Sequence, residues 1–406
     1  MRLFAVILLA AAACHGQKFT QRGYLETNLF AYPRAVRGDS GKAVGEAVLN
    51  YESTYNLTPW LRLNGAFEGR TDTHRQVERT WDVSFWDRER LRPAFTVPKW
   101  GATISKGKLT LDLGRQFIRW GKADILNPTD RFAPRDYINV VQTKYLGVTG
   151  GRLTYGGQSD SIDLVFLPRF TPSRTPILGQ RWVVLQGIPP TTTVRDGPTK
   201  FAPGPQYGAR WNHISKLAEF SFSFYEGYNH LPLIDPQLRS RPIRLELTRY
   251  FPRMRMYGAD AAVPLRYFTV KAEAAYFGSS TTTADEYVIY VVQAERQTGE
   301  WLFVGGYAGE HVTNRRSEFL FAPDRGLTRT FLGRAGYTID ANRSFALEAA
   351  VRQDGMGSWT RFEYSHAFGQ HWRATAGISW IRGQSPDFLG QYFRNSHSNF
   401  ILRYSF

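Results

Sequence analysis

The sequence predicts an all-β fold: a transmembrane antiparallel β-barrel of about 18 strands, with long outer loops and short periplasmic turns. Three observations lead to this prediction: segments of about ten residues that alternate apolar and polar side chains, links that alternate between short and long, and an aromatic residue at the end of the chain. The final segment, 398–406 (SNFILRYSF), carries Phe400, Leu402, Tyr404 and Phe406 on one parity. A last strand that ends in this way is typical of outer-membrane barrels, and we interpret Phe406 as a signal for the outer-membrane assembly machinery.

The first residues predict a secretory signal peptide, 1–16 (MRLFAVILLAAAACHG), in which Arg2 precedes an apolar run and small residues follow. The run is too short to span a bilayer as a helix. Cleavage after Gly16 leaves residues 17–406 as a single barrel domain, which contains no cysteine and therefore no disulfide. The alternative is cleavage before Cys14 with lipid attached to that cysteine, although the preceding leucine lies too far upstream for a good lipoprotein signal.

The composition argues against a helical membrane protein and against a nucleic-acid-binding protein. Downstream of the signal, no apolar run approaches the roughly 18 residues that a membrane helix needs, whereas barrel strands keep the mean hydropathy low by alternation. The formal net charge of +16 indicates anionic partners. For an exported chain, we expect these partners to be the lipopolysaccharide of the outer membrane or small anionic solutes.

Five segments show the alternation clearly: 218–227, 266–277, 343–353, 359–368 and 371–380. In each, aromatic or aliphatic side chains share one parity and polar side chains share the other, with aromatic residues near segment ends, where membrane interfaces favour them. We expect the polar parity to face the lumen, where the predicted wall charges include Arg62, Lys271, Glu273, Glu348, Arg352, Arg361 and Arg373. Because these charges are of both signs, the wall alone predicts no ion preference.

The links between segments alternate in length, and the longest are 119–146, 169–204 and 228–253. Short periplasmic turns and long outer loops place both termini in the periplasm of a bacterial outer membrane. One amphipathic piece, 243–250, breaks the alternation if it counts as wall, so we assign it to an outer-loop excursion; a barrel of about 16 strands is the alternative. A soluble β-propeller would repeat its signature roughly every 40 to 50 residues, and the sequence has no such repeat.

One stretch, 114–137 (GRQFIRWGKADILNPTDRFAPRDY), does not fit a wall strand. Pro128 and Pro134 interrupt strand pairing, and the NPTD motif favours a turn. Its charges are the candidate constriction residues: Arg119, Lys122, Asp124, Asp130, Arg131, Arg135 and Asp136. Two interpretations are open. In the first, the loop folds into the lumen, where facing charges create a transverse field that favours polar solutes. In the second, the charges pair with one another and only hold an outer loop in place.

The same stretch, together with 207–211 (YGARW), 252–265 (PRMRMYGADAAVPL) and 389–406 (LGQYFRNSHSNFILRYSF), resembles a porin-like family of proteobacterial and acidobacterial outer-membrane barrels. These pieces are spread over most of the mature chain. The resemblance implies an outer-membrane barrel with a pore role. It implies no particular substrate and no catalytic residue.

The predicted function is passive diffusion of small hydrophilic solutes through a porin-like channel that the 119–146 link narrows, helped by the 169–204 link. These two links and 228–253 carry most of the excess basic charge, which predicts a mild preference for anions. A barrel that acts as a scaffold, an adhesin or a partner-binding protein without an open pore is the alternative. We predict no enzyme and no metal or other cofactor, because the sequence has no G-x-S-x-G elbow, no H-E-x-x-H motif and no cysteine cluster.

Overall fold

The computed structural model is all-β, with only short helical turns between strands. It describes residues 18–184, 188–189, 191–240, 243–316 and 321–406. The predicted signal peptide and Cys14 lie outside these residues. Among the described residues, no helix has the length and the apolar character needed to cross a bilayer.

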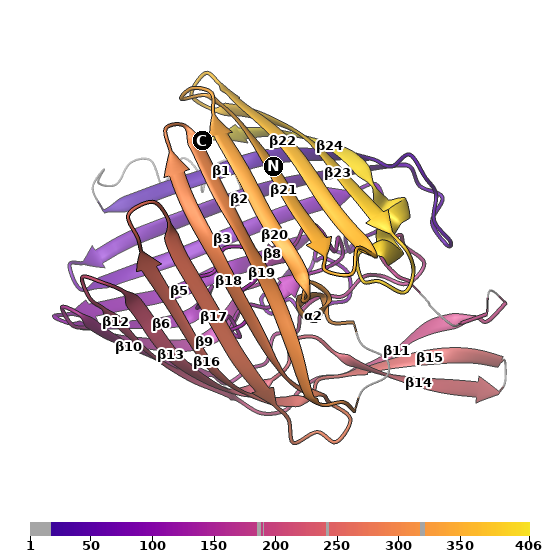
Figure 1. The fold of residues 1–406 in the computed structure, drawn as a ribbon, viewed down its shortest axis with the longest axis horizontal. Coiled ribbons are helices and arrows are strands. Elements are labelled where there is room, and N and C mark those ends of the chain that lie inside the picture. Colours follow the sequence, from indigo (N-terminus) through magenta and orange to yellow (C-terminus); the bar gives the residue numbers. More distant parts are fainter. Residues whose placement is uncertain (1–17, 185–187, 190, 241–242, 317–320) are drawn as a thin grey trace.

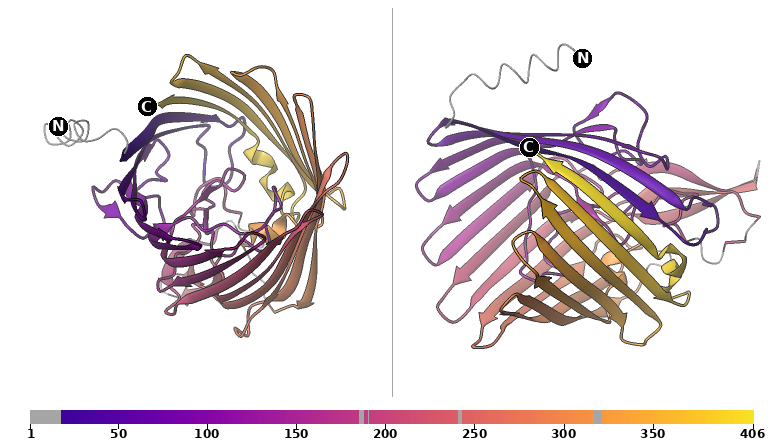
Figure 2. Two further views of the ribbon diagram at one scale, coloured as in Figure 1. Left: turned by 90° about the vertical axis from the view of Figure 1, so that its left-hand side faces the viewer. Right: turned by 90° about the horizontal axis from the view of Figure 1, so that it is seen from above.

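Eighteen antiparallel strands form a closed barrel wall (Figures 1 and 2). In order around the wall they are β1 (Phe19–Ala31), β2 (Ala43–Thr58), β3 (Leu61–Asp72), β5 (Phe95–Lys106), β6 (Leu109–Gln116), β9 (Val148–Gly156), β10 (Asp160–Leu167), β12 (Gln206–Ile214), β13 (Glu219–Tyr228), β16 (Arg253–Pro264), β17 (Thr269–Gly278), β18 (Glu286–Thr298), β19 (Trp301–Asn314), β20 (Thr330–Thr338), β21 (Arg343–Arg352), β22 (Gly357–Phe368), β23 (Trp372–Gly383) and β24 (His397–Ser405).

The first and last wall strands close the barrel. β1 pairs with β24, from Tyr24 opposite Ser405 to Ala31 opposite Ser398. Closure leaves the wall without an exposed strand edge, so its backbone groups are paired around the whole circumference. The expected fold class and the count of 18 strands are confirmed, and the alternative count of 16 is wrong.

The segment 243–250 forms β15 (Ile243–Tyr250), which lies outside the wall. This agrees with the prediction that the segment belongs to an outer-loop excursion. β15 pairs with β14 (Leu233–Ser240) and with β11 (Val194–Lys200), and this three-stranded sheet projects beyond the long-loop end of the barrel (Figure 1). The other short elements are β4 (Val83–Ser84), β7 (Arg135–Asp136), β8 (Lys144–Tyr145), α2 (Pro323–Gly326) and η2 (Gly390–Asn395).

The alternation of the wall strands separates an apolar outer face from a polar inner face. On β13, Phe222 is exposed on the outside, whereas Ser221 and Ser223 are buried inside. Aromatic rings gather on the outer face at the short-turn end, where Trp301 lies 4.6 Å from Tyr337 between ring centroids. Such an apolar band with an aromatic girdle is the surface that a bilayer covers in membrane barrels.

The largest apolar core lies inside the barrel, between one side of the wall and residues 117–147, which we call the lumen link. Figure 2 shows segments of chain within the ring of strands. Ile118, Trp120 and Phe132 of the lumen link are buried there. Phe132 packs edge-on against Trp120 and against the inward-facing Tyr225 of β13, with centroid distances of 5.1 and 5.0 Å. Apolar packing therefore holds the lumen link against the wall, in addition to its charges.

Candidate functional site

Glu273 of β17 is the main polar anchor of the lumen link. Its carboxylate accepts hydrogen bonds from the backbone N–H groups of Lys122, Ala123 and Thr129, at 3.1, 3.2 and 2.7 Å, and from the Thr129 hydroxyl at 2.8 Å. Gly121 passes directly over this carboxylate with φ +93°. A Cβ at this position would lie only 2.7 Å from a Glu273 oxygen, so the close approach requires glycine. A wall carboxylate thus supplies the acceptors that a loop crossing a protein interior otherwise lacks.

Two further charges bind the lumen link to the same side of the wall. The Lys122 ammonium lies 2.8 Å from Glu219 of β13 and 3.2 Å from Asp260 of β16. The Asp124 carboxylate lies 2.8 Å from the Lys271 ammonium of β17. Ion pairs between the link and inward-facing wall residues therefore fix the part of the link that follows Gly121.

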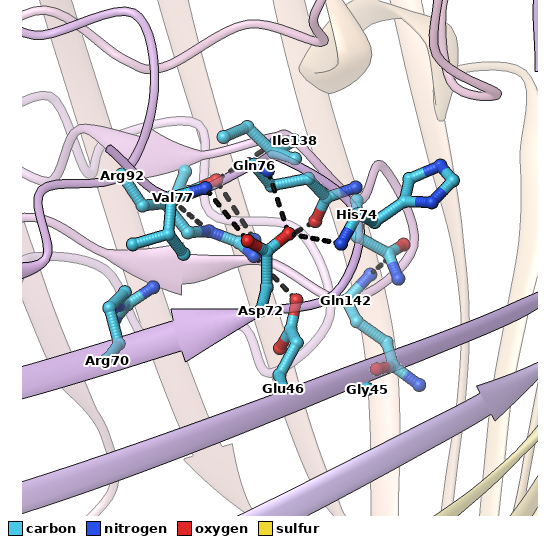
Figure 3. A network of polar contacts seen from close by, with 12 residues as sticks. Gly45, Glu46, Arg70, Asp72, His74, Gln76, Val77, Arg92, Ile138 and Gln142 are labelled. Atoms are coloured by element: carbon cyan, nitrogen blue, oxygen red, sulfur yellow. Dashed lines mark hydrogen bonds and ion pairs between the residues drawn. The ribbon is translucent and has the colours of Figure 1, made fainter. Parts of the chain in front are cut away.

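Asp136 belongs to a buried ion-pair network that joins the lumen link to other loops. Its carboxylate accepts hydrogen bonds from Arg92 at 2.8 Å and from Arg174 at 3.0 Å. Arg92 also reaches Glu46 of β2 at 2.7 Å, as Figure 3 shows, and Arg174 reaches Asp87 at 3.1 Å. Although burial opposes ionisation, the two guanidinium groups hold the pKa of Asp136 well below its usual range.

Two arginines of the lumen link share one tyrosine. The guanidinium groups of Arg119 and Arg135 lie 3.9 and 4.5 Å from the centroid of the Tyr145 ring, and Arg135 donates a hydrogen bond of 2.7 Å to its hydroxyl. Arg119 also donates to the buried Asp130 carboxylate at 2.5 Å. The stacking orients both cations.

A cavity of about 690 Å³ separates the lumen link from the opposite side of the wall. Eight basic side chains line it: Arg70, Arg92, Arg131, Arg135, Lys144, Arg334, Arg361 and Arg403. Seven acidic side chains line it as well: Glu26, Glu46, Asp124, Asp130, Glu295, Asp324 and Glu348. A space with such a lining suits water and polar solutes, because charged groups pay a large desolvation penalty in a dry cavity.

The residues that the sequence singled out divide into two groups. Four constriction candidates line the cavity, namely Asp124, Asp130, Arg131 and Arg135, and so do the wall candidates Glu348 and Arg361. The remaining candidates do not line the cavity. Arg119, Lys122 and Asp136 make the contacts described above, and Lys271 and Glu273 lie beneath the link. Arg352 forms an ion pair with Asp387, whereas Arg62 and Arg373 occupy exposed positions toward the short-turn end.

Nine charged residues of the cavity were missed as site candidates, and four of them show why. Glu26 and Arg403 face each other across the closing seam, where the Arg403 Nε donates to the Glu26 carboxylate at 2.8 Å. Arg70 of β3 and Lys144 of β8 also line the cavity, and burial together with the Arg70 charge lowers the pKa of Lys144. Residues 26, 70 and 403 occupy the inward parity of their strands, so the alternation pattern already contained the signal that identifies them.

In the described residues, no group of three or more His, Cys, Asp or Glu side chains is arranged to hold a metal ion.

No model of a known protein family matches the sequence, and no curated protein matches it. Several solved structures share the fold. Acinetobacter baumannii OccAB4 is 11% identical with a TM-score of 0.55, and the match covers 96% of this chain and 99% of that one. Pseudomonas aeruginosa OccK11 (OpdR) is 8% identical with a TM-score of 0.54 over 95% of each chain. P. aeruginosa OpdQ is 10% identical with a TM-score of 0.51 over 97% and 99%. At these identities the likeness shows that the chain has the fold of these barrels.

Proposed function

We propose that this chain is a porin-like channel of a bacterial outer membrane, through which small hydrophilic solutes diffuse passively with a mild preference for anions. The observation that carries the proposal is a charged cavity inside a closed barrel whose outer face is apolar. The outer face suits lipid and the inner face suits water. The lumen link serves as the constriction, because it narrows the lumen from one side. The proposal assigns the chain no catalytic step.

The anion preference is inferred from which charges of the cavity are compensated. Each of the seven carboxylates at its lining has a basic partner, as the pairs of Glu26 with Arg403 and Asp324 with Arg131 illustrate. Arg135 and Lys144 line the same space, and within the described part of the chain neither has a carboxylate partner. Asp124 and Glu295 share one lysine, Lys271, so the two unpaired cations leave the lining with an excess of one positive charge, eight basic against seven acidic side chains, which enriches anions.

Removing these two cations is expected to abolish the preference. In planar bilayers under a salt gradient, we expect an anion-to-cation permeability ratio of roughly two for the wild type, larger at low salt, and a ratio of about one for the Arg135→Gln, Lys144→Gln double variant. Lys106→Gln with Lys108→Gln, in an exposed turn outside the lumen, is the matched control and should behave as wild type. A cation-selective wild type, or an unchanged ratio in the double variant, would contradict the assignment of these charges to the pore.

We further propose that both termini face the periplasm, with the long links outside. The support is the length difference between the two ends of the barrel, because short periplasmic turns and long outer loops are usual in such barrels. An epitope tag inserted after Pro236, in the projecting sheet, should be labelled on intact cells. A tag after Gly299, in a short turn, should be labelled only after permeabilisation. Equal labelling of both tags on intact cells would reverse or reject this orientation.

One observation favours a second candidate function, a barrel that binds a partner through its loops. The sheet of β11, β15 and β14 projects beyond the wall, and Leu238 at its surface is 71% exposed. The conductance measurement separates the two functions, since a partner-binding barrel with a closed lumen shows no stable open steps.

A further inference from the structure

The outer face of the barrel has a notch at the closing seam, on the long-loop end. β23 continues to Gly383, whereas β24 begins only at His397, which pairs with Ser379. Beyond that pair, the chain after β1 and the end of β23 bracket a groove whose floor comes from the residues around η2. Its outward lining includes Pro33, Arg34, Trp380, Arg382 and Phe393.

A second, apolar groove continues from the notch toward the middle of the wall. The two grooves share Ala31, Ile378 and Ser398, so they form one continuous depression. Strand pairing places Ile378, Ser398 and Ala31 in one row across β23, β24 and β1. Larger exposed side chains, among them Leu29 and Phe400, flank this row and form the sides of the groove. Its apolar lining suits an extended hydrocarbon chain.

The notch carries uncompensated positive charge. Arg34 and Arg382 line it from opposite sides, and Arg394 lies beside them, with its guanidinium 3.3 Å from the Ala35 carbonyl oxygen. Among the described residues, no carboxylate pairs with any of these three arginines, and neither groove is lined by an aspartate or a glutamate. Arg382 stacks on Trp380, at 4.3 Å from the ring centroid, which orients its guanidinium at the groove.

We propose that this double groove binds one acylated lipid whose head group carries phosphate monoesters, the chemistry of lipid A. An acyl chain lies in the apolar groove, and phosphate oxygens accept hydrogen bonds from Arg34, Arg382 and Arg394. Three guanidinium groups exceed what a single zwitterionic head group needs, and guanidinium binds phosphate through paired N–H donors. The inference rests on the proposed membrane location and orientation, and it is independent of channel activity.

The test measures lipid binding to the purified barrel in detergent by native mass spectrometry. Lipid A with both phosphates is expected to bind as one retained equivalent, and its dephosphorylated form about tenfold or more weakly. The variant Arg34→Gln, Arg382→Gln, Arg394→Gln should lose the same factor for lipid A. The matched control, Lys216→Gln, Arg266→Gln, Arg296→Gln, removes three exposed cations at the opposite end of the barrel and should bind as wild type.

A second variant tests the apolar half without touching an arginine. Ala376→Phe fills the apolar groove with a bulky side chain and should weaken the binding of both lipid forms several-fold. Inorganic phosphate should not displace the bound lipid. Heat-modifiable migration confirms folding of each variant. The proposal is overturned if the two lipid forms bind equally, if the control variant loses as much binding as the arginine variant, or if phosphate alone displaces the lipid. It is also overturned if the barrel forms a dimer that Ala376→Phe dissociates, because a second copy of the chain would then occupy the groove. Conductance of the arginine variant should equal that of wild type, so a failed lipid test and a failed channel test remain distinguishable.

Discussion

Glu273→Ala is expected to raise the single-channel conductance roughly twofold or more, because an 18-stranded barrel without its constriction has a wide lumen. The Glu273 carboxylate accepts four hydrogen bonds from the lumen link, three of them from backbone N–H groups. A buried N–H group without an acceptor costs about 1 to 3 kcal/mol, so the stretch of the link from Gly121 to Thr129 is expected to leave its place over β17. The apolar packing of Ile118, Trp120 and Phe132 is untouched, so the part of the link near Gly121 should move while the rest stays.

Two controls accompany this measurement. Glu273→Gln keeps one carbonyl oxygen at the same place and should give an intermediate conductance. Glu52→Ala removes an inward-facing carboxylate that lies outside the cavity lining and pairs with Arg22 of the neighbouring β1, and its conductance should stay near that of wild type. If Glu273→Ala folds normally and conducts as wild type, Glu273 does not hold the constriction.

Deletion of Phe406 is expected to cause a several-fold loss of folded protein from the outer membrane. The terminal residue extends the closing seam, since its N–H donates to the Gly23 carbonyl at 3.0 Å and its carbonyl accepts from the Gly23 N–H at 2.9 Å. Its ring lies over Gly23, where a Cβ would come within 2.6 Å of the ring atoms. Deletion removes two hydrogen bonds, each worth about 1 kcal/mol net, as well as the ring that we expect the assembly machinery to read.

Substitutions separate these two contributions. Phe406→Ala keeps the backbone hydrogen bonds and loses only the ring, whereas Phe406→Tyr keeps both. Phe400→Ala removes an outward ring of the same strand that is exposed to a similar extent, 45% against 49%. We expect loss of assembly in Phe406→Ala and not in Phe400→Ala or Phe406→Tyr, measured as heat-modifiable protein in outer-membrane fractions. Equal yields in Phe406→Ala and wild type would mean that the aromatic ring is no assembly signal.

The wall of the barrel could be predicted from local patterns. Adjacent residues of a strand point to opposite faces, so a segment between lipid and lumen must alternate, as 218–227 and 371–380 do. The segment 243–250 shows the limit of this argument. It is amphipathic like a wall strand, yet β15 pairs outside the wall, and only the alternation of link lengths excluded it.

The roles of the candidate constriction residues depended on contacts between distant parts of the chain. Asp136 pairs with Arg92 and Arg174, which are 44 and 38 residues away, so a charge that the sequence placed at the pore lies in a buried network. Lys122 is held by Glu219 and Asp260 of the wall. Neither pairing follows from the spacing of charges within 114–137, because each partner comes from another loop or strand.

Glu273, the anchor of the lumen link, shows why the sequence predicts the wall strands but not the roles of individual charged residues. Glu273 has the same inward parity and the same charge as Glu348, and local sequence alone does not distinguish a carboxylate that faces water from one that accepts backbone N–H groups. The difference arises when the barrel closes and the link crosses the lumen. Its buried N–H groups then need acceptors, and the register of the closed wall places Glu273, rather than Glu348, within reach.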